Sequence, residues 1–317
     1  MNHPKNTPLR VAILDDYQNV ALTSADWSPV AARAEITVFT DHVSDEDKLV
    51  ERLAPFDAIM VMRERTPLPR NVIERLPRLR MIASTGAFNA SIDMAAAADA
   101  GIHVAHTTGT IASTVELTWA LILGASRHIV AERQSVAGGG WQTTVGRELD
   151  RRVLGVLGLG RIGTHVARIG AAFGMDVVAW SANLTADAAT DAGARYLPRE
   201  QFFATADVVS VHLKLSERSR GLIGAAELAL MKETALLVNT SRGPIVDEAA
   251  LIEALRSRSI AGAALDVFDV EPLPADHPLR TLDNVLATPH IGYVADRPYR
   301  LFHRDAAAAI AEWLERS

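Results

Sequence analysis

The stretch VLGVLGLGRIGTHVA (residues 153–167) decides the fold, because it joins an apolar run to a glycine-rich turn and a helical segment. Gly158, Gly160 and Gly163 have the spacing Gly-x-Gly-x-x-Gly. In a strand–turn–helix unit the first glycine permits a tight turn, the second lets the backbone approach a pyrophosphate, and the third lets the helix pack on the strand. The helix N-terminus would attract phosphate charge. This context predicts a dinucleotide-binding β-α-β unit rather than a purely structural glycine turn.

The end of the next predicted strand leaves the choice between NAD and NADP open. An NAD-binding protein usually places Asp or Glu there to hold the ribose 2′-hydroxyl. Ser181 stands at that position instead. Its hydroxyl can bind a ribose hydroxyl but does not repel a 2′-phosphate, and no Arg or Lys follows within residues 182–194 to bind one. Asn183 could contact the ribose of either cofactor, and NAD is slightly favoured.

Outward from this unit, apolar runs alternate with helical stretches along the whole chain. Strands are expected in the first part at residues 11–14, 36–39, 58–62, 79–84 and 102–105, and in the second at residues 153–157, 177–180, 208–213, 235–239, 263–267 and 285–287. Helices are expected at residues 45–53, 71–76, 92–100 (after Ser91 as N-cap), 113–133, 162–173 and 297–315. Such alternation predicts two α/β units, each with a parallel sheet covered by helices.

Three predicted strand ends in the second unit carry polar side chains. Arg242 ends the run LLVNTSR, and His290 follows the run VLATP. Between them, the segment AALDVFDVEP supplies a carboxylate from Asp266, Asp269 or Glu271. Each residue alone has an ordinary explanation as a surface charge, a loop acid or a turn. Ligands of such sheets bind beyond the carboxyl ends of the strands. The joint placement therefore favours one site beside the nicotinamide.

That set of side chains suits hydride transfer to a ketone that lies next to a carboxylate. A guanidinium binds and polarises a 2-keto acid through charge-assisted hydrogen bonds. An imidazole can donate a proton as the carbonyl becomes an alcohol and remove it in the reverse direction. A neighbouring carboxylate favours the imidazolium and holds the ring in place. The cofactor would carry the hydride.

Composition excludes several other classes of protein. The 317 residues carry a net charge of −6, which argues against a general nucleic-acid binder. There is no cysteine, so disulfides, thiolate metal sites and cysteine nucleophiles are excluded. No apolar run is long enough for a membrane helix, and residues 1–10 lack a signal-peptide core. We therefore expect a cytoplasmic protein with no membrane partner.

The chain resembles the D-isomer-specific 2-hydroxyacid dehydrogenase family, with its phosphoglycerate and glyoxylate/hydroxypyruvate relatives. The segments LGVLGLGRIG, LLVNTSRGPIVDEAAL, GAALDVFDVEPLP and ATPHIG carry the resemblance. It implies that Arg242 binds substrate, that Glu271 pairs with the acid–base residue His290, and that Asp266 lies near the nicotinamide carboxamide. The further cofactor contacts that it implies are Arg161, Ile162 and Thr240.

The resemblance also implies how the chain is threaded. A flavodoxin-like substrate domain would comprise residues 1–105 and 295–317, and a Rossmann NAD(P)-binding domain residues 106–294. The active site would lie in the cleft between these domains. Members are commonly dimeric through the cofactor domain, with the helix at residues 113–133 in the interface. We therefore expect a homodimer that acts on a small 2-keto or 2-hydroxy acid.

The substrate loop departs from the family pattern of two closely spaced glycines. It keeps Gly86 but continues with Ala87, Phe88 and Asn89, which would change the shape of the pocket. In the run MRERTPLP, Arg63 or Arg65 could reach an acidic substrate, although a solvated charge is the favoured interpretation for each.

Three further interpretations concern alternatives to this site and other candidate residues. A cofactor-sensing regulatory protein on the same scaffold, like the family's corepressor relatives, is the rival to an enzyme. A metal site at His103 and His106 is rejected, because residues three apart on a strand point to opposite faces. Trp119, Trp141 and Trp313 are interpreted as packing residues.

Overall fold

The computed structural model describes residues 8–316 and divides the chain into two compact units. Unit 1 contains the chain up to Thr110 together with the segment from Val294 onward, and unit 2 comprises Ile111–Tyr293. The first seven residues of the polar N-terminal segment lie outside the described part of the chain. The functional assignment of the two units stays a prediction.

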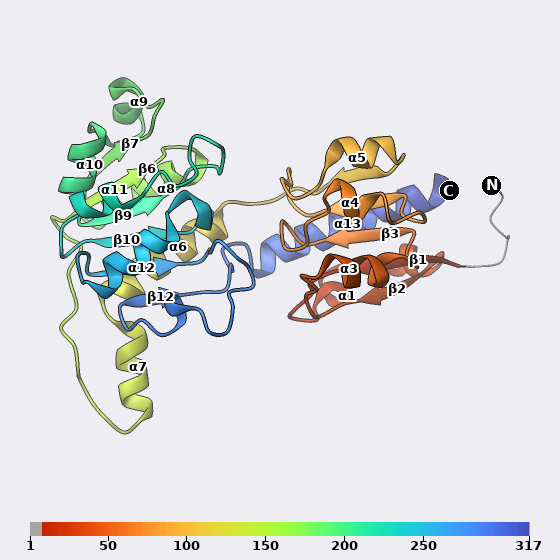
Figure 1. Cartoon of the computed structure of the whole chain (residues 1–317), viewed down its shortest axis with the longest axis horizontal. Coiled ribbons are helices and arrows are strands. Elements are labelled where there is room, and N and C mark those ends of the chain that lie inside the picture. Colours follow the sequence, from red (N-terminus) through yellow and green to blue (C-terminus); the bar gives the residue numbers. More distant parts are fainter. Residues whose placement is uncertain (1–7, 317) are drawn as a thin grey trace. The chain divides into compact units, whose positions relative to one another are not determined.

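Unit 1 is built on a five-stranded parallel sheet in the order β2-β1-β3-β4-β5 (Figure 1). Its strands are β1 (Leu9–Ile13), β2 (Ala34–Val38), β3 (Ala58–Val61), β4 (Met81–Ser84) and β5 (His103–His106). Its helices are α1 (Ala21–Ser24), α2 (Ser28–Ala31), α3 (Glu46–Leu53), α4 (Arg70–Ile73), α5 (Met94–Asp99) and α13 (Asp296–Arg316). The long α13 packs on β4 and β5, so the end of the chain completes this unit. The strand order reverses between β1 and β3, as in flavodoxin-like sheets.

Unit 2 is built on a seven-stranded parallel sheet in the order β12-β11-β10-β9-β6-β7-β8. Its strands are β6 (Val153–Leu157), β7 (Asp176–Trp180), β8 (Arg195–Tyr196), β9 (Val208–Val211), β10 (Leu236–Asn239), β11 (Gly262–Leu265) and β12 (Val285–Ala287). Its helices are α6 (Ala112–Ser126), α7 (Ile129–Ala137), α8 (Arg161–Ala172), α9 (Ala186–Asp191), α10 (Arg199–Thr205), α11 (Ala225–Leu230) and α12 (Glu248–Arg256), with the 3₁₀ turns η1 (Gly243–Ile245) and η2 (Pro278–Arg280). The α/β class with two parallel sheets is confirmed.

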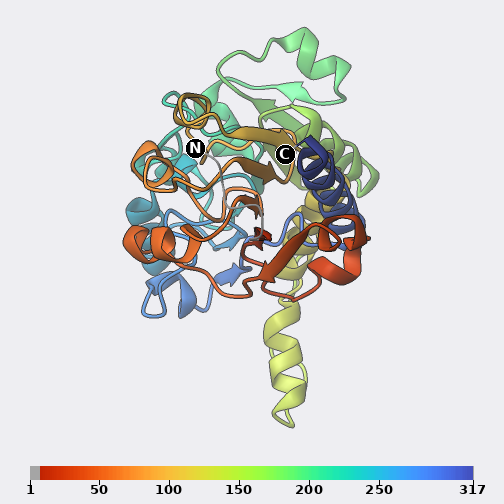
Figure 2. The ribbon, with the colours of Figure 1, turned by 90° about the vertical axis from the view of Figure 1, so that its right-hand side faces the viewer.

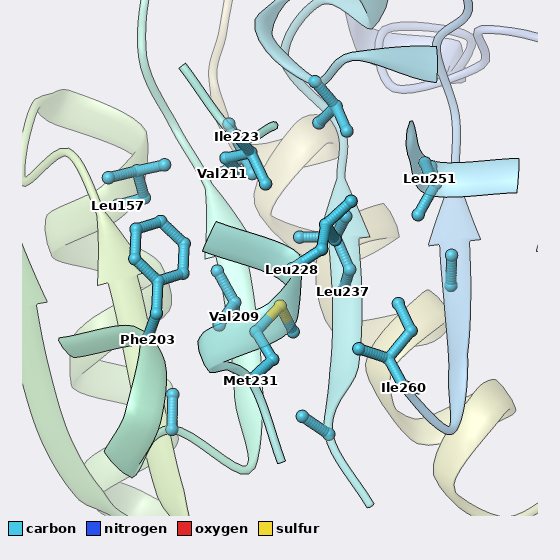
Figure 3. Packing of buried hydrophobic residues seen from close by; sticks show 14 of the residues in the cluster. Leu157, Phe203, Val209, Val211, Ile223, Leu228, Met231, Leu237, Leu251 and Ile260 are labelled. Carbon is cyan, nitrogen blue, oxygen red and sulfur yellow. The ribbon is translucent and has the colours of Figure 1, made fainter. Parts of the chain in front are cut away.

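Two hydrophobic layers cover the sheet of unit 2. Leu237 belongs to the layer formed with α10, α11 and α12, whereas the next residue, Val238, belongs to the layer formed with α6 and α8 (Figure 3). Phe202 and Phe203 are fully buried in the first layer and meet edge to face at 5.1 Å between ring centroids. The near-continuous apolar strands of the sequence follow from this burial on both faces.

Several sequence expectations were wrong in detail. The helix expected at residues 113–133 is two helices, because His128 adopts a left-handed backbone (φ 51) between α6 and α7. The N-cap of α5 is Asp93, which accepts a hydrogen bond from Ala96 N, and not Ser91. The short edge strand β8 was missed. Trp141 is 74% exposed and so does not pack in this chain.

Helix α7 and the loop behind it extend away from the sheet of unit 2 in both views (Figure 1, Figure 2). No residue of α7 is buried. The returning loop is fixed to the helix by Glu132, whose carboxylate accepts hydrogen bonds from the backbone and hydroxyl groups of Thr143 and Thr144. The projecting arm (residues 129–145) is thus an ordered element with apolar side chains at its surface.

Candidate active site

The glycine turn forms an open cradle at the carboxyl end of β6. Gly158 has a φ of +100, a value that favours glycine. A Cβ on Gly163 would lie 2.0 Å from the carbonyl oxygen of Gly158, so the start of α8 packs closely on the turn. A Cβ on Gly160 would meet nothing within 4 Å. The backbone at Gly160 therefore faces free space at a helix N-terminus, which fits a dinucleotide pyrophosphate.

The ends of the two neighbouring strands lie against this turn. Gly158 N donates to the carbonyl oxygen of Trp180 at 3.0 Å, which places Ser181 beside the turn on the β7 side. On the β9 side, a Cβ on Gly158 would lie 2.8 Å from the Leu213 side chain, and Lys214 follows directly. Sequence reasoning overlooked Lys214. The signal for it is its place just past the end of a strand that neighbours the glycine strand.

The carboxyl end of β10 presents Arg242 in extended conformation just before η1. The side chain of Asn239 braces this turn, since its amide nitrogen donates to Arg242 O at 2.9 Å and its oxygen accepts from Ser241 N at 3.0 Å. Thr240 is buried, and its hydroxyl lies 2.8 Å from that of Thr118 on α6. The segment that carries Arg242 is therefore held from inside the unit.

His290 and Glu271 form a close pair. Nδ1 of His290 lies 2.5 Å from Oε2 of Glu271, and the two side chains are 21% and 32% exposed. The other carboxylate oxygen of Glu271 accepts from Phe268 N at 2.9 Å, and Tyr293 packs edge to face against the imidazole at 5.5 Å. Because a carboxylate only accepts, Nδ1 is the donor, and Nε2 is left to exchange a proton.

Asp266 holds the turn that carries His290. Its buried carboxylate accepts hydrogen bonds from Thr288 Oγ1 at 2.6 Å, Ile291 N at 2.8 Å and Gly292 N at 2.8 Å. Burial raises the pKa of Asp266 above its usual range, although these hydrogen bonds and the charge of His290 act in the opposite direction. The sequence hypothesis gave Asp266 a cofactor contact and did not foresee this supporting role.

Close packing joins the arginine turn to the acid–base pair. A Cβ on Gly243 would lie 2.1 Å from the carbonyl carbon of Phe268, so the backbone after Arg242 touches the backbone that binds Glu271. The structure thus brings Arg242, Glu271 and His290 to the carboxyl edge of the sheet that also carries the glycine turn.

The substrate-loop residues lie in unit 1, at the ends of β3 and β4. Gly86 has a φ of +85 and its N–H donates to Thr107 Oγ1 at 2.7 Å. Ala87 is exposed and Phe88 is 68% exposed, whereas Asn89 is buried. The Arg63 side chain is 22% exposed and so is partly in contact with solvent, and its role stays a prediction.

The other predicted cofactor residues follow the glycine turn and strand β7. Arg161, at the start of α8, and Asn183, after β7, are exposed, and Ile162 is partly buried. Among residues 8–316, no group of His, Asp or Glu is arranged to hold a metal ion, and no helix is long and apolar enough to cross a membrane.

Comparison with known proteins agrees with this geometry. The family described as "D-isomer specific 2-hydroxyacid dehydrogenase, NAD binding domain" matches residues 119–292. The chain belongs to this family. It is 43% identical to a glyoxylate reductase of Aeropyrum pernix over 230 residues, 69% of each chain. It is 37% identical to a hydroxypyruvate reductase of Thermotoga maritima over 266 residues, 82% of this chain and 85% of that one.

A solved structure extends the similarity to the whole chain. A phosphoglycerate oxidoreductase from Vibrio cholerae o395 superposes with a TM-score of 0.92 at 37% identity, covering 98% of this chain and 100% of that one. The protein is accordingly an oxidoreductase that transfers a hydride between NAD(H) and the 2-keto/D-2-hydroxy acid pair. The comparisons give no support to the regulatory alternative.

Proposed function

We propose that Arg242, Glu271 and His290 perform the chemistry of this 2-hydroxyacid dehydrogenase. The 2.5 Å contact between His290 and Glu271 carries the proposal, because it fixes the ring and leaves one nitrogen for proton transfer. Arg242 binds the substrate carboxylate and polarises the neighbouring carbonyl. Its turn packs against the backbone that binds Glu271, which supports a common site.

The proton follows a path set by this pair. When bound, the nicotinamide supplies the hydride to the carbonyl carbon in reduction and takes it back in oxidation. In reduction, His290 starts as the imidazolium, and its charge is stabilised by Glu271. Nε2 of His290 then donates its proton to the carbonyl oxygen, which becomes a hydroxyl. The hydrogen bonds of Asp266 keep the ring in place during both directions.

The glycine turn would hold the dinucleotide. The free space at Gly160 fits the pyrophosphate, and Arg161, Ile162, Ser181, Asn183, Thr240 and Asp266 are the further proposed contacts. NAD(H) is the favoured cofactor, and NADP(H) is accepted as well, because Ser181 does not repel a 2′-phosphate. Arg63 and the loop of Gly86, Ala87 and Phe88 are the proposed substrate contacts in unit 1.

Turnover tests this function directly. The protein is mixed with NADH or NADPH and with glyoxylate, hydroxypyruvate, pyruvate or longer 2-keto acids, and absorbance of the reduced cofactor is followed. We expect consumption with at least one short 2-keto acid. If no acid of the panel is reduced above background while the cofactor still binds, the protein is a sensor on the same scaffold.

A substitution then tests the acid–base residue. His290→Ala should lower kcat by at least about a hundredfold, the usual contribution of a positioned acid–base group. Its dissociation constant for NADH, measured by calorimetry, should stay within about threefold of the original. His103→Ala, at an exposed histidine of β5, is the matched control and should keep full turnover. Loss of cofactor binding in His290→Ala would argue against the assigned role.

A homodimer through unit 2 is expected, with α6 and the start of α7 in the interface, and the projecting arm extends this proposed interface. Ile129, Val130, Val136, Trp141 and Val145 of the arm are all exposed, and Val145 is 91% exposed. Beside α7 lies a groove of about 620 Å³ whose lining runs from α6 to β12. An ordered apolar arm next to a groove suits a two-fold interface in which each copy covers the other. Light scattering should give twice the chain mass, and Trp141→Glu with Val145→Glu should give the single mass.

A further inference from the structure

Two charged residues of unit 1 stand at its ligand edge. Arg63 and Glu64 follow β3, one of the two strands between which the strand order reverses. In open α/β sheets, ligands bind beyond the carboxyl ends of the strands at such a reversal. Arg63 also has a left-handed backbone (φ 52), which a buried amide supports: Asn89 Nδ2 donates to Arg63 O at 2.6 Å.

The guanidinium of Arg63 lies across the Gly86 loop. Its Nη1 donates to Thr85 O at 3.2 Å, and a Cβ on Gly86 would lie 1.6 Å from that nitrogen. On its other side, Nη2 lies 3.6 Å from Oε2 of Glu64. The Glu64 side chain is 16% exposed, so solvent screens this pair less than a surface pair. The positive charge at the loop is therefore largely balanced by an adjacent carboxylate.

The second arginine of the run is engaged within unit 1. Arg65 Nη1 donates to Asp15 O at 2.7 Å, and its guanidinium stacks over the Tyr17 ring at 4.5 Å. Thr66, the next residue, donates to the Asp15 carboxylate at 2.5 Å, so this part of the run is fixed by Asp15. Of the two guanidinium groups, only Arg63 borders the substrate loop, and it does so with Glu64 beside it.

We propose that Glu64 is a specificity residue that excludes phosphorylated substrates. Resting on the function proposed above, this inference assigns the site to short 2-keto acids with an uncharged side chain. A phosphate carries nearly two negative charges and needs Arg or Lys with few competing carboxylates. Glu64 both occupies Arg63 and repels such a group, whereas a hydrogen or hydroxymethyl substituent meets no such penalty.

Hydroxypyruvate and its phosphate ester test the proposal, because they differ only in the phosphate. We expect the unaltered protein to prefer hydroxypyruvate in kcat/KM by at least about tenfold. Glu64→Gln should raise the ratio of kcat/KM for the ester to kcat/KM for hydroxypyruvate by about tenfold, mainly through a lower KM for the ester. Glu64→Ser repeats the test if the first variant folds poorly. Glu74→Gln, which removes an exposed carboxylate paired with Arg70, is the matched control.

A double substitution tests whether the gain for the ester comes from the Arg63 charge that Glu64→Gln leaves unpaired. If Glu64 acts by occupying Arg63, then Arg63→Gln in the Glu64→Gln background should abolish the gain for the ester. A native preference for the ester, or an unchanged substrate ratio in both Glu64 variants, overturns the inference while leaving the proposed function intact. Absence of turnover with every 2-keto acid refutes the proposed function itself, and this inference with it.

Discussion

Replacement of Asp266 by Asn should uncouple the placement of His290 from the rest of the site. The carboxylate accepts three hydrogen bonds, from Thr288, Ile291 and Gly292, and all three fix the turn that carries His290. An amide keeps one oxygen but turns the other acceptor into a donor. If the oxygen stays with Thr288 and Ile291, the new NH₂ group faces the N–H of Gly292, and neither donor has an acceptor.

The energetic cost follows from these contacts. A hydrogen bond to a charged acceptor contributes about 1.5–3 kcal/mol, and a buried unsatisfied donor costs about 1–3 kcal/mol. Since burial raises the pKa of Asp266, the carboxylate itself carries a desolvation penalty that Asn does not, and this offsets part of the loss. The net loss is roughly 2–4 kcal/mol, equivalent to a Tm lower by about 5–15 °C for a unit of this size.

Calorimetry and kinetics on the same variant give the answer. Asp266→Asn should lower Tm by that amount and reduce kcat at least tenfold, because a misplaced imidazole loses alignment with the carbonyl oxygen. Asp283→Asn breaks an exposed pair with Arg258 and should cost at most about 1 kcal/mol. An Asp266 variant as stable and as active as the Asp283 control would refute the reasoning.

The pH dependence of Asp266 gives the same experiment a signed prediction. A raised pKa means that the folded state binds the proton more tightly than the unfolded state. The protein therefore loses stability, relative to the Asn variant, as pH rises from the ordinary value of 3.8 through the raised pKa. The free energy of unfolding of the unaltered protein should therefore exceed that of Asp266→Asn by more at the acidic end of this pH window.

Three other predictions concern the glycine turn of unit 2 and the strands on either side of it. Gly160→Ala should fold with an unchanged Tm but bind NADH at least tenfold more weakly by calorimetry, whereas Gly163→Ala should lower Tm by several degrees because its Cβ would clash with Gly158 O. Ser181→Asp should weaken NADPH binding at least about tenfold while sparing NADH, and equal effects on both would contradict the ribose assignment. Burial lowers the pKa of His212 to about 4, so the protein should lose up to about 3 kcal/mol as pH falls from 6.5 to 4, and His212→Gln should remove that loss in denaturant titrations.

Local chemistry explains why much of the site was predictable from sequence. The glycine turn is specified by close approaches within a few residues, such as Gly163 on Gly158, so its spacing is visible in the sequence. The ends of parallel strands share one edge, so Arg242 and His290 could be grouped once the strands were recognised. The strand bounds differed from expectation by only a few residues because these strands are buried on both faces.

The supporting residues could not be predicted, because their partners are distant in the chain. Nothing near Asp266 in the sequence indicates that its carboxylate binds the backbone of Gly292. The break at His128 depends on one left-handed residue that is not glycine, in a run whose composition suits a continuous helix. The engagement of Arg63 by Thr85 and Glu64 likewise depends on how β3 and β4 are placed side by side.

The backbone conformations of His290 and Arg63 show how the supporting residues act on the predicted site residues. Both have a φ of 52, which costs a residue with a side chain about 1 kcal/mol or more and persists only where the surroundings impose it. Asp266 imposes it on the turn of His290, and Asn89 holds the carbonyl of Arg63. In His290 and Arg63, a buried polar group thus stabilises the strained backbone that directs the side chain. Changes at Asp266 or Asn89 should therefore disturb the chemistry through the placement of His290 and Arg63.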